Sequence, residues 1–208
     1  MRFFRQIIAV MILLCATLAQ AGVVEGRDYK VLNPPQPVSS GNKIEVLEFF
    51  FYGCSHCYHL HPALNTWEKS KPADVDLQPV PVIFRDNWEP MARTFYALES
   101  MGQLKQHHDA LFEAWNVFNN YLIEEAQVIE FLSKRGMDKT KFRAAYNSFS
   151  VGSKVMRSKQ LVQAYALRGT PTVAVDGKYI ITGLSPEETI RVLDEVIKIA
   201  RKERSGRK

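Results

Sequence analysis

The stretch that decides the fold is Phe51-Tyr52-Gly53-Cys54-Ser55-His56-Cys57-Tyr58, which follows an apolar run typical of a β-strand. A Cys-x-x-Cys pair whose first cysteine opens a helix places one sulfur beside unpaired backbone N–H groups, which stabilise a thiolate. We therefore predict that Cys54 is the attacking sulfur. Three residues make about one helical turn, so Cys57 lies below Cys54, close enough to form a disulfide and to resolve a mixed disulfide.

The N-terminus has the features of a secretory leader. Arg2 and Arg5 precede an uncharged run, residues 7–19, which ends in Ala19-Gln20-Ala21, the small-x-small pattern of signal peptidase sites. The run is shorter than the roughly 20 residues that a bilayer span needs, which disfavours a retained anchor. We expect residues 1–21 to be a cleavable signal peptide, cut after Ala21.

The cysteine count and the charge exclude several classes of protein. Of the three cysteines in 208 residues, Cys15 falls inside the leader, so the exported chain keeps a single pair, too few for a multi-disulfide scaffold. Of the 27 Lys and Arg residues, two lie in the leader, which leaves 25 against 22 acidic residues and a net charge near +3. Part of this excess lies in residues 201–208, which we interpret as a frayed, solvated end. We expect no nucleic-acid partner.

The first part of the exported chain is an entry segment and a central strand. Residues 22–42 are rich in Pro, Ser and Gly and predict turns, with at most a short strand at residues 29–32. Residues 43–52 are apolar on both alternating faces from Val46 onward, which is typical of a strand covered on each side. This strand leads directly to the cysteines.

A helix and a second strand follow the cysteines. Residues 55–70 predict a helix that is interrupted or bent at Pro62, and residues 75–84 predict the strand. A strand, a helix and a second strand in this order predict a right-handed crossover.

The segment from Trp88 to about Arg168 has apolar residues at helical spacing and predicts four or five helices. The breaks between them are expected at turn-forming sequences, namely Gly102, Asn119-Asn120, Gly136-Met137-Asp138 and Gly152. We interpret the aromatic side chains of this segment as core rather than as a ligand-binding site. They are Trp88, Phe95, Trp115 and Phe118.

The C-terminal part predicts a hairpin and a final helix. Asp176-Gly177 lies between two β-rich runs, residues 170–175 and 178–183, which is a strong signal for a two-residue hairpin. Ser185-Pro186-Glu187-Glu188 is a capping box with proline at the first helical position. Together with the preceding segments, this ending predicts an α/β fold with one central sheet and a helical insertion.

In this order, the motifs resemble the thioredoxin fold and, within it, the DsbA family of exported thiol:disulfide oxidoreductases. The residues that carry the resemblance are Val46-Leu47-Glu48-Phe49-Phe50, Cys54-Ser55-His56-Cys57-Tyr58, the helical segment, and Arg168-Gly169-Thr170-Pro171-Thr172 leading into Val175-Asp176-Gly177-Lys178-Tyr179. The resemblance implies a thioredoxin-like domain with a central mixed sheet over residues 22–208, interrupted by an all-helical insertion at about 88–168.

The resemblance also implies roles for single residues. Cys54 accepts electrons from substrate thiols, and the backbone of Thr170 pairs with the substrate. Pro171 is cis, and its ring faces the disulfide and excludes metal. The alternative for Pro171 is a trans proline that starts a strand.

Two further side chains belong to the implied site. Glu48 is a buried acid that handles protons near Cys57, and burial raises the pKa of such a carboxyl group, which suits a proton shuttle. The alternative is a side chain that reaches solvent from a sheet edge. His56 lies between the cysteines, where a donor or a partial positive charge favours the Cys54 thiolate, and the alternative is a surface histidine. No cofactor is implied.

Two positions depart from the best-known DsbA pattern. That pattern has proline at position 55 and valine at position 170, where this chain has Ser55 and Thr170. The residues between the cysteines and before the cis-proline tune thiolate stabilisation and substrate release. The oxidising strength is therefore less well predicted than the oxidoreductase chemistry.

The function that the resemblance implies is a periplasmic dithiol oxidase. Its Cys54–Cys57 disulfide oxidises the free thiols of folding exported proteins by dithiol–disulfide exchange. A quinone-coupled membrane partner of the DsbB kind then re-oxidises the pair. A reductase or isomerase could use the same two residues. We find no separate dimerisation domain of the sort that family isomerases carry, so we expect a monomer.

Two other functions remain as alternatives. Cys54 and Cys57 with His59 and His61 offer four ligands for zinc or copper. Helical ligands prefer separations of three or four residues, however, and positions 57, 59 and 61 point in different directions. A dedicated assembly factor for one exported protein is also compatible with the sequence.

Overall fold

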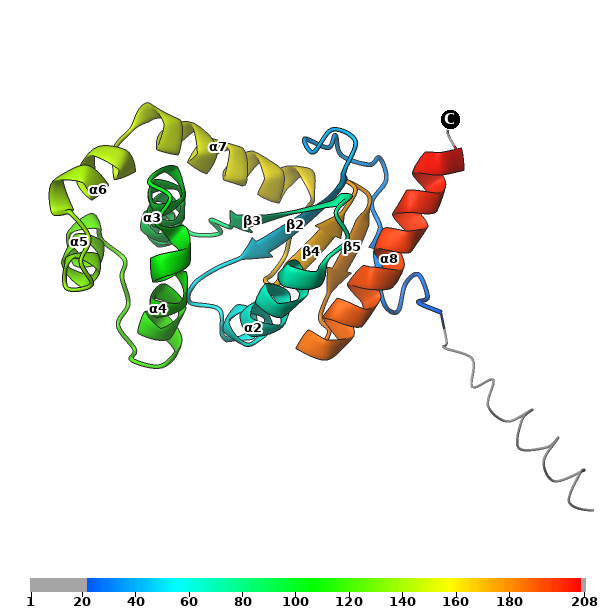
Figure 1. Cartoon of the computed structure of the whole chain (residues 1–208), viewed down its shortest axis with the longest axis horizontal. Helices are drawn as coiled ribbons and strands as arrows, with labels where there is room; N and C mark the ends of the chain where they lie inside the picture. The colour runs from blue at the N-terminus through cyan, green and yellow to red at the C-terminus, as the bar shows by residue number, and fades with distance from the viewer. Residues whose placement is uncertain (1–21, 207–208) are drawn as a thin grey trace, which may run out of the picture.

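The computed structural model describes residues 22–206, which form a mixed five-stranded sheet with helices packed around it (Figure 1). The predicted signal peptide, residues 1–21, lies outside the described residues. The strand order is β1-β5-β4-β2-β3, and only β2 and β3 are parallel. The strands are β1 (Lys30–Val31), β2 (Ile44–Phe50), β3 (Val75–Pro81), β4 (Thr172–Val175) and β5 (Tyr179–Thr182). This confirms the predicted α/β fold.

Strand β2 is the central strand that its sequence predicts. All seven of its residues are buried, and it pairs with β3 on one side and β4 on the other. Its alternating side chains enter different parts of the core, with Ile44 and Val46 in the cluster formed with the C-terminal helix and Leu47 and Phe49 in the cluster formed with the helical insertion. The strand therefore joins both parts of the molecule and ends just before the cysteines.

Helices α2 (Ser55–Ser70) and α8 (Pro186–Gly206) pack side by side against the sheet (Figure 1). The indole Nε1 of Trp67 in α2 donates to Asp194 of α8 across 2.8 Å. Helix α2 runs through Pro62 without interruption. At the start of α8, Ser185 and Glu188 exchange side-chain-to-backbone hydrogen bonds of 3.2 Å each, which confirms the predicted capping box.

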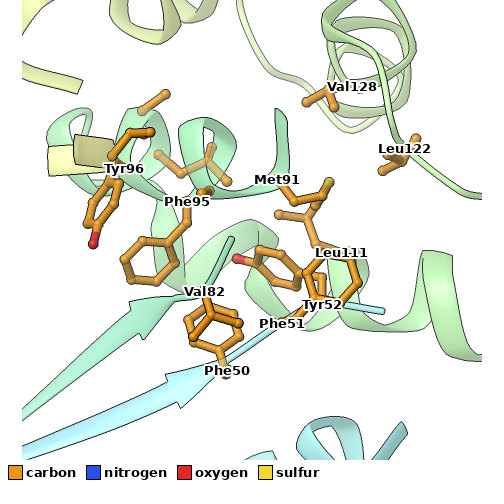
Figure 2. Close-up of a cluster of buried hydrophobic side chains, with 14 of the residues drawn as sticks. Phe50, Phe51, Tyr52, Val82, Met91, Phe95, Tyr96, Leu111, Leu122 and Val128 are labelled. Carbon is orange, nitrogen blue, oxygen red and sulfur yellow. The ribbon is translucent and has the colours of Figure 1, made fainter. Parts of the chain in front are cut away.

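The helical insertion lies at one end of the sheet (Figure 1) and contains five α-helices and one short 3₁₀ turn. Figure 2 shows Phe50 and Tyr52, from the end of β2 and the residues after it, in a shared core with Met91, Phe95 and Leu111 of the insertion. The elements are η1 (Asp86–Trp88), α3 (Glu89–Ser100), α4 (Leu104–Asn116), α5 (Glu125–Ser133), α6 (Lys139–Tyr146) and α7 (Phe149–Ala164).

Two predictions about the insertion are wrong. Gly152 lies inside α7, and the break before this helix is at Ser148, whose hydroxyl caps the helix by accepting from Val151 N at 3.2 Å. Phe118 is 62% exposed, because it follows the end of α4 and no element covers it as core. Phe95 is fully buried, as predicted, and Trp88 and Trp115 are partly buried against the same cluster.

The prediction of a frayed C-terminal end is also wrong. Helix α8 continues to Gly206, and its basic side chains pair with acids from other elements. Arg201 donates to Asp74 at 2.7 Å, and Arg204 forms a bidentate pair with Asp176 of the β4–β5 hairpin. These ion pairs hold the last turns of the helix against the sheet.

The β4–β5 turn has the backbone that Asp-Gly predicts. Asp176 and Gly177 have φ values of 55° and 68°, and Lys178 N donates to Val175 O at 3.0 Å. A Cβ atom on residue 177 would lie only 2.0 Å from the carbonyl oxygen of Gln36, so the entry segment packs directly on this glycine. Within residues 22–206, no helix is long and apolar enough to cross a membrane.

Candidate active site

Cys54 occupies the N-cap position of α2, with φ of −92° and ψ of 114°. Its Sγ accepts the backbone N–H of Cys57 at 3.4 Å, so the thiol takes the place of the usual oxygen cap. Hydrogen bonds from the side chains of Cys57 and Thr170, together with the backbone N–H groups of Cys57 and His56, lower the pKa of Cys54 to about 5, although partial burial opposes the change. Cys54 is therefore poised as a stable thiolate.

Cys57 has the opposite environment. Its side chain is fully buried in the core cluster that contains Phe51 and Tyr52. Burial raises the pKa of the Cys57 thiol, and the hydrogen bond to Cys54 acts in the same direction. The pair therefore combines one accessible thiolate with one protonated, buried thiol, which is what a nucleophile and a resolving thiol require.

A second segment meets the cysteines from the other end of the chain. The Thr170–Pro171 peptide bond is cis, so the alternative of a trans proline is wrong. The sulfur of Cys54 lies 3.3 Å from the carbonyl oxygen of Thr170, to which it donates when it is protonated. Strand β4 begins at Thr172, immediately after this peptide, and its pairing with β2 fixes the peptide beside the cysteines.

Glu48 lies in the middle of β2 and is only 4% exposed, so the alternative of a sheet-edge position is wrong. Among the described residues its Oε1 atom has no hydrogen-bond partner. Burial raises the pKa of Glu48 to about 8, and the nearby charge of Glu68 adds to the rise. Glu48 also lines a cavity of about 520 Å³ together with His61, His108 and Asp109. A carboxyl group with this pKa can exchange protons near neutral pH.

Comparison with known proteins identifies this arrangement. The family model of the DSBA-like thioredoxin domain matches residues 45–193. The chain belongs to the DsbA-like thioredoxin family.

Among its relatives, the "Thiol:disulfide interchange protein DsbA" of Burkholderia cepacia is 42% identical over 193 residues, which cover 89% of this chain and 91% of the relative. The protein of the same name from Pseudomonas aeruginosa is 39% identical, over 88% of this chain and 87% of the relative. The crystal structure of Pseudomonas aeruginosa DsbA superposes with a TM-score of 0.84 at 37% identity, covering 88% of this chain and 97% of that one.

His56 of the predicted redox site and His59 and His61 of the alternative metal site have different surroundings. His56 is exposed, and what reaches Cys54 from this residue is its backbone N–H. His59 is also exposed, whereas His61 is buried and pairs through Nε2 with Asp109 at 2.7 Å. Within residues 22–206, no three His, Cys, Asp or Glu side chains are grouped closely enough to hold a metal ion.

The sequence did not single out the contacts between this DsbA-like site and helix α4. The amide of Asn116 donates to Tyr52 O at 2.7 Å, and the hydroxyl of Tyr52 bonds His108 Nδ1 at 2.6 Å. Because burial lowers the pKa of His108 to about 3, its ring is neutral in this hydrogen bond with the Tyr52 hydroxyl. Apart from helical periodicity, no local signal marks Asn116 or His108, since their partners lie more than 50 residues away in the sequence.

Proposed function

We propose that this protein is a dithiol oxidase that introduces disulfides into other proteins through Cys54 and Cys57. Membership of the DsbA-like family makes it a thiol:disulfide oxidoreductase, in agreement with the names of its relatives. The observation that carries the oxidising direction is the Cys54 sulfur at the N-terminus of α2, where it accepts the Cys57 N–H. A thiolate gains from this position and a disulfide sulfur does not, so the reduced form is favoured and the disulfide is readily given away.

The reaction follows from the two thiol environments. A substrate thiolate attacks Cys54 Sγ of the disulfide, the S–S bond breaks, and Cys57 leaves and takes up a proton. The substrate's second thiolate then attacks the substrate sulfur of the mixed disulfide, and Cys54 leaves as a stabilised thiolate. The substrate loses two electrons and gains a disulfide, and the enzyme pair gains the two electrons.

Residues around the pair have supporting roles in this proposal. The backbone at Thr170 pairs with the substrate chain beside the nucleophile, and Pro171 shields the sulfurs from metal. Glu48 supplies or accepts the proton of Cys57, in keeping with its burial and its pKa of about 8. His56 adds a favourable dipole or charge to the Cys54 thiolate.

The cellular setting is likewise part of the proposal. The chain is exported to the periplasm after cleavage behind Ala21, and residues 22–208 act as one monomeric thioredoxin-like domain with the insertion at about 88–168. Its substrates are exported proteins with free thiols. A quinone-coupled membrane protein of the DsbB kind re-oxidises Cys54 and Cys57, and neither a cofactor nor nucleic acid takes part.

The experiment that tests the direction is acid trapping of the protein from its own compartment, followed by alkylation of free thiols and mass measurement. An oxidase is recovered mainly with the Cys54–Cys57 disulfide formed. Recovery mainly as the dithiol would contradict the proposal and favour a reductase or isomerase.

A further inference from the structure

The short segment between β2 and the nucleophile is held by the end of helix α4. Cys54 N donates to Phe51 O at 3.0 Å, so the segment makes a tight turn before α2 begins. Within this turn, Tyr52 O accepts the side-chain amide of Asn116 at 2.7 Å. The other proton of the same amide goes to Phe112 O, four residues earlier in α4, at 2.8 Å. Both amide protons of Asn116 are used, which fixes its orientation.

The residue before Asn116 contacts the same turn through its ring. A Cβ atom on Gly53 would lie 2.5 Å from Cε3 of Trp115, so the indole lies against the Gly53 backbone with no room for a side chain. The indole also meets the ring of Phe51 edge-to-face, with ring centroids 5.1 Å apart, and Phe51 stacks on Trp88 with ring centroids 3.7 Å apart. Two aromatic side chains of the insertion, Trp115 and Trp88, therefore contact this turn.

We propose that Asn116 and Trp115 are positioning residues for the nucleophile: by fixing Tyr52 O and the Gly53 backbone, the end of α4 holds Cys54 Sγ on the N-terminus of α2. This inference rests on the proposed function, because it assumes that Cys54 is the attacking sulfur. It gives the helical insertion a part in the chemistry, although the insertion carries neither cysteine.

The physical reason is that the sulfur must stay aligned with the backbone N–H groups that stabilise its thiolate. Gly53 is the direct neighbour of Cys54, and a glycine backbone is the most mobile kind. Without the hydrogen bond from Asn116 to Tyr52 O and the contact of the Trp115 ring with Gly53, the turn adopts conformations in which Cys54 Sγ no longer accepts the backbone N–H of Cys57. The thiolate is then less stabilised on average, and the pKa of Cys54 rises.

The main variant is Asn116→Leu, which has a similar shape and carries no charge. Its matched control is Asn147→Leu, because the Asn147 amide also donates to the carbonyl four residues earlier, Arg143 O at 3.1 Å, and to a distant partner, Glu125 at 3.0 Å. Asn147 caps the end of α6. The control therefore removes an equivalent pair of bonds from the insertion without touching the turn.

A second variant, Trp115→Phe, tests the proposal independently if Asn116→Leu does not fold. The Nε1 atom of Trp115 is buried and has no hydrogen-bond partner among residues 22–206. Trp115→Phe therefore strands no polar group and only shortens the ring that lies on Gly53. It should raise the pKa of Cys54, as Asn116→Leu should.

The measurement is the rate of Cys54 alkylation by iodoacetamide in the reduced full-length exported protein as a function of pH. We expect the wild-type midpoint near 5, and a rise of about half a unit in both α4 variants, which is roughly threefold slower alkylation one unit below the wild-type midpoint. Asn147→Leu should superpose on the wild type. Cooperative thermal unfolding establishes that each variant is folded.

Two contrary results have different meanings. A wild-type midpoint near that of a free thiol, about 8.5, would contradict the proposed function itself. A low wild-type midpoint that neither Asn116→Leu nor Trp115→Phe shifts, or that Asn147→Leu shifts equally, would overturn the positioning role alone.

Discussion

The sulfur of Cys54 lies 3.3 Å from the carbonyl oxygen of Thr170, to which its protonated form donates, although 116 residues separate the two in the sequence. This contact is made by the backbone of Thr170, and the side chain of Thr170 forms a further hydrogen bond to Cys54 that lowers the pKa of the thiol. The nucleophile therefore depends on the docking of β4 against β2, and a substrate chain that pairs with Thr170 is brought directly to the sulfur.

Thr170→Val should raise the pKa of Cys54 above about 5, because the substitution removes the side-chain hydrogen bond of Thr170 that lowers this pKa. Alkylation of the reduced variant as a function of pH measures this. A midpoint unchanged from that of the wild type would show that the Thr170 hydroxyl does not stabilise the thiolate.

The roles of the two cysteines can be separated by substitution. Cys57→Ser should accumulate mixed disulfides with exported proteins, since the resolving thiol is gone, whereas Cys54→Ser should trap none. Non-reducing gels followed by mass spectrometry detect the adducts. If Cys54→Ser is the variant that forms them, the roles are reversed.

Glu48→Gln keeps the shape of the side chain and removes its titration. Because the folded pKa of Glu48 is raised from 4.5 to about 8, its contribution to stability is fully present below 4.5 and is lost as the pH rises through 8. At the upper end of this window the variant should be more stable than the wild type by roughly 2–4 kcal/mol.

Urea unfolding of both proteins at pH values from 4.5 to 8 measures the Glu48 effect. The variant should also exchange thiols more slowly, with a weaker dependence on pH. If the free energies of unfolding of the wild type and of Glu48→Gln change equally with pH over this range, Glu48 does not titrate in the folded protein.

Two glycines should respond to alanine with opposite signs. Gly177→Ala should destabilise the fold by about 1–3 kcal/mol, because φ is 68° and the new Cβ meets Gln36 O. Gly152→Ala, inside α7 with open space around it, should stabilise by about 0.5–1 kcal/mol. Thermal unfolding gives both values, and equal signs would contradict the packing described for the turn.

Much of the fold is predictable because its signals are local. The alternation in β2, the Asp176-Gly177 turn and the capping box at Ser185 each depend on a few neighbouring residues, and the structure has all three. The wrong predictions concern segments whose structure depends on residues far away in the sequence. The C-terminal tail is ordered by Asp74 and Asp176.

The site divides in the same way. Cys54 and Cys57 are recognisable from spacing alone, and Glu48 from its apolar flanks. The contact of Asn116 with Tyr52 spans 64 residues and joins a helix end to a loop, so neither sequence segment shows it. In the sequence, Gly53 alone indicates this contact, since a glycine beside a nucleophile is often a position where another part of the chain approaches the backbone closely.

The central claim is that the reduced protein is the more stable form because the folded structure stabilises the Cys54 thiolate. Folding lowers the pKa of this thiol from 9.0 to about 5, so the stabilisation is fully present above 9.0 and disappears as the pH falls through 5. Since Cys54 is only half-buried, we expect the effect at neutral pH to be about 1–2 kcal/mol. His56→Ala keeps the backbone N–H. It should reduce the difference in stability between the reduced and oxidised proteins by the amount that the His56 side chain contributes.

The most direct test is denaturant unfolding of the oxidised and reduced proteins in parallel, from neutral pH down to values below 5. The account predicts that the reduced form is more stable at neutral pH and that its advantage shrinks as the pH falls through the Cys54 titration. An oxidised form that is the more stable one at every pH would contradict it, and the protein would then be a reductase or an isomerase.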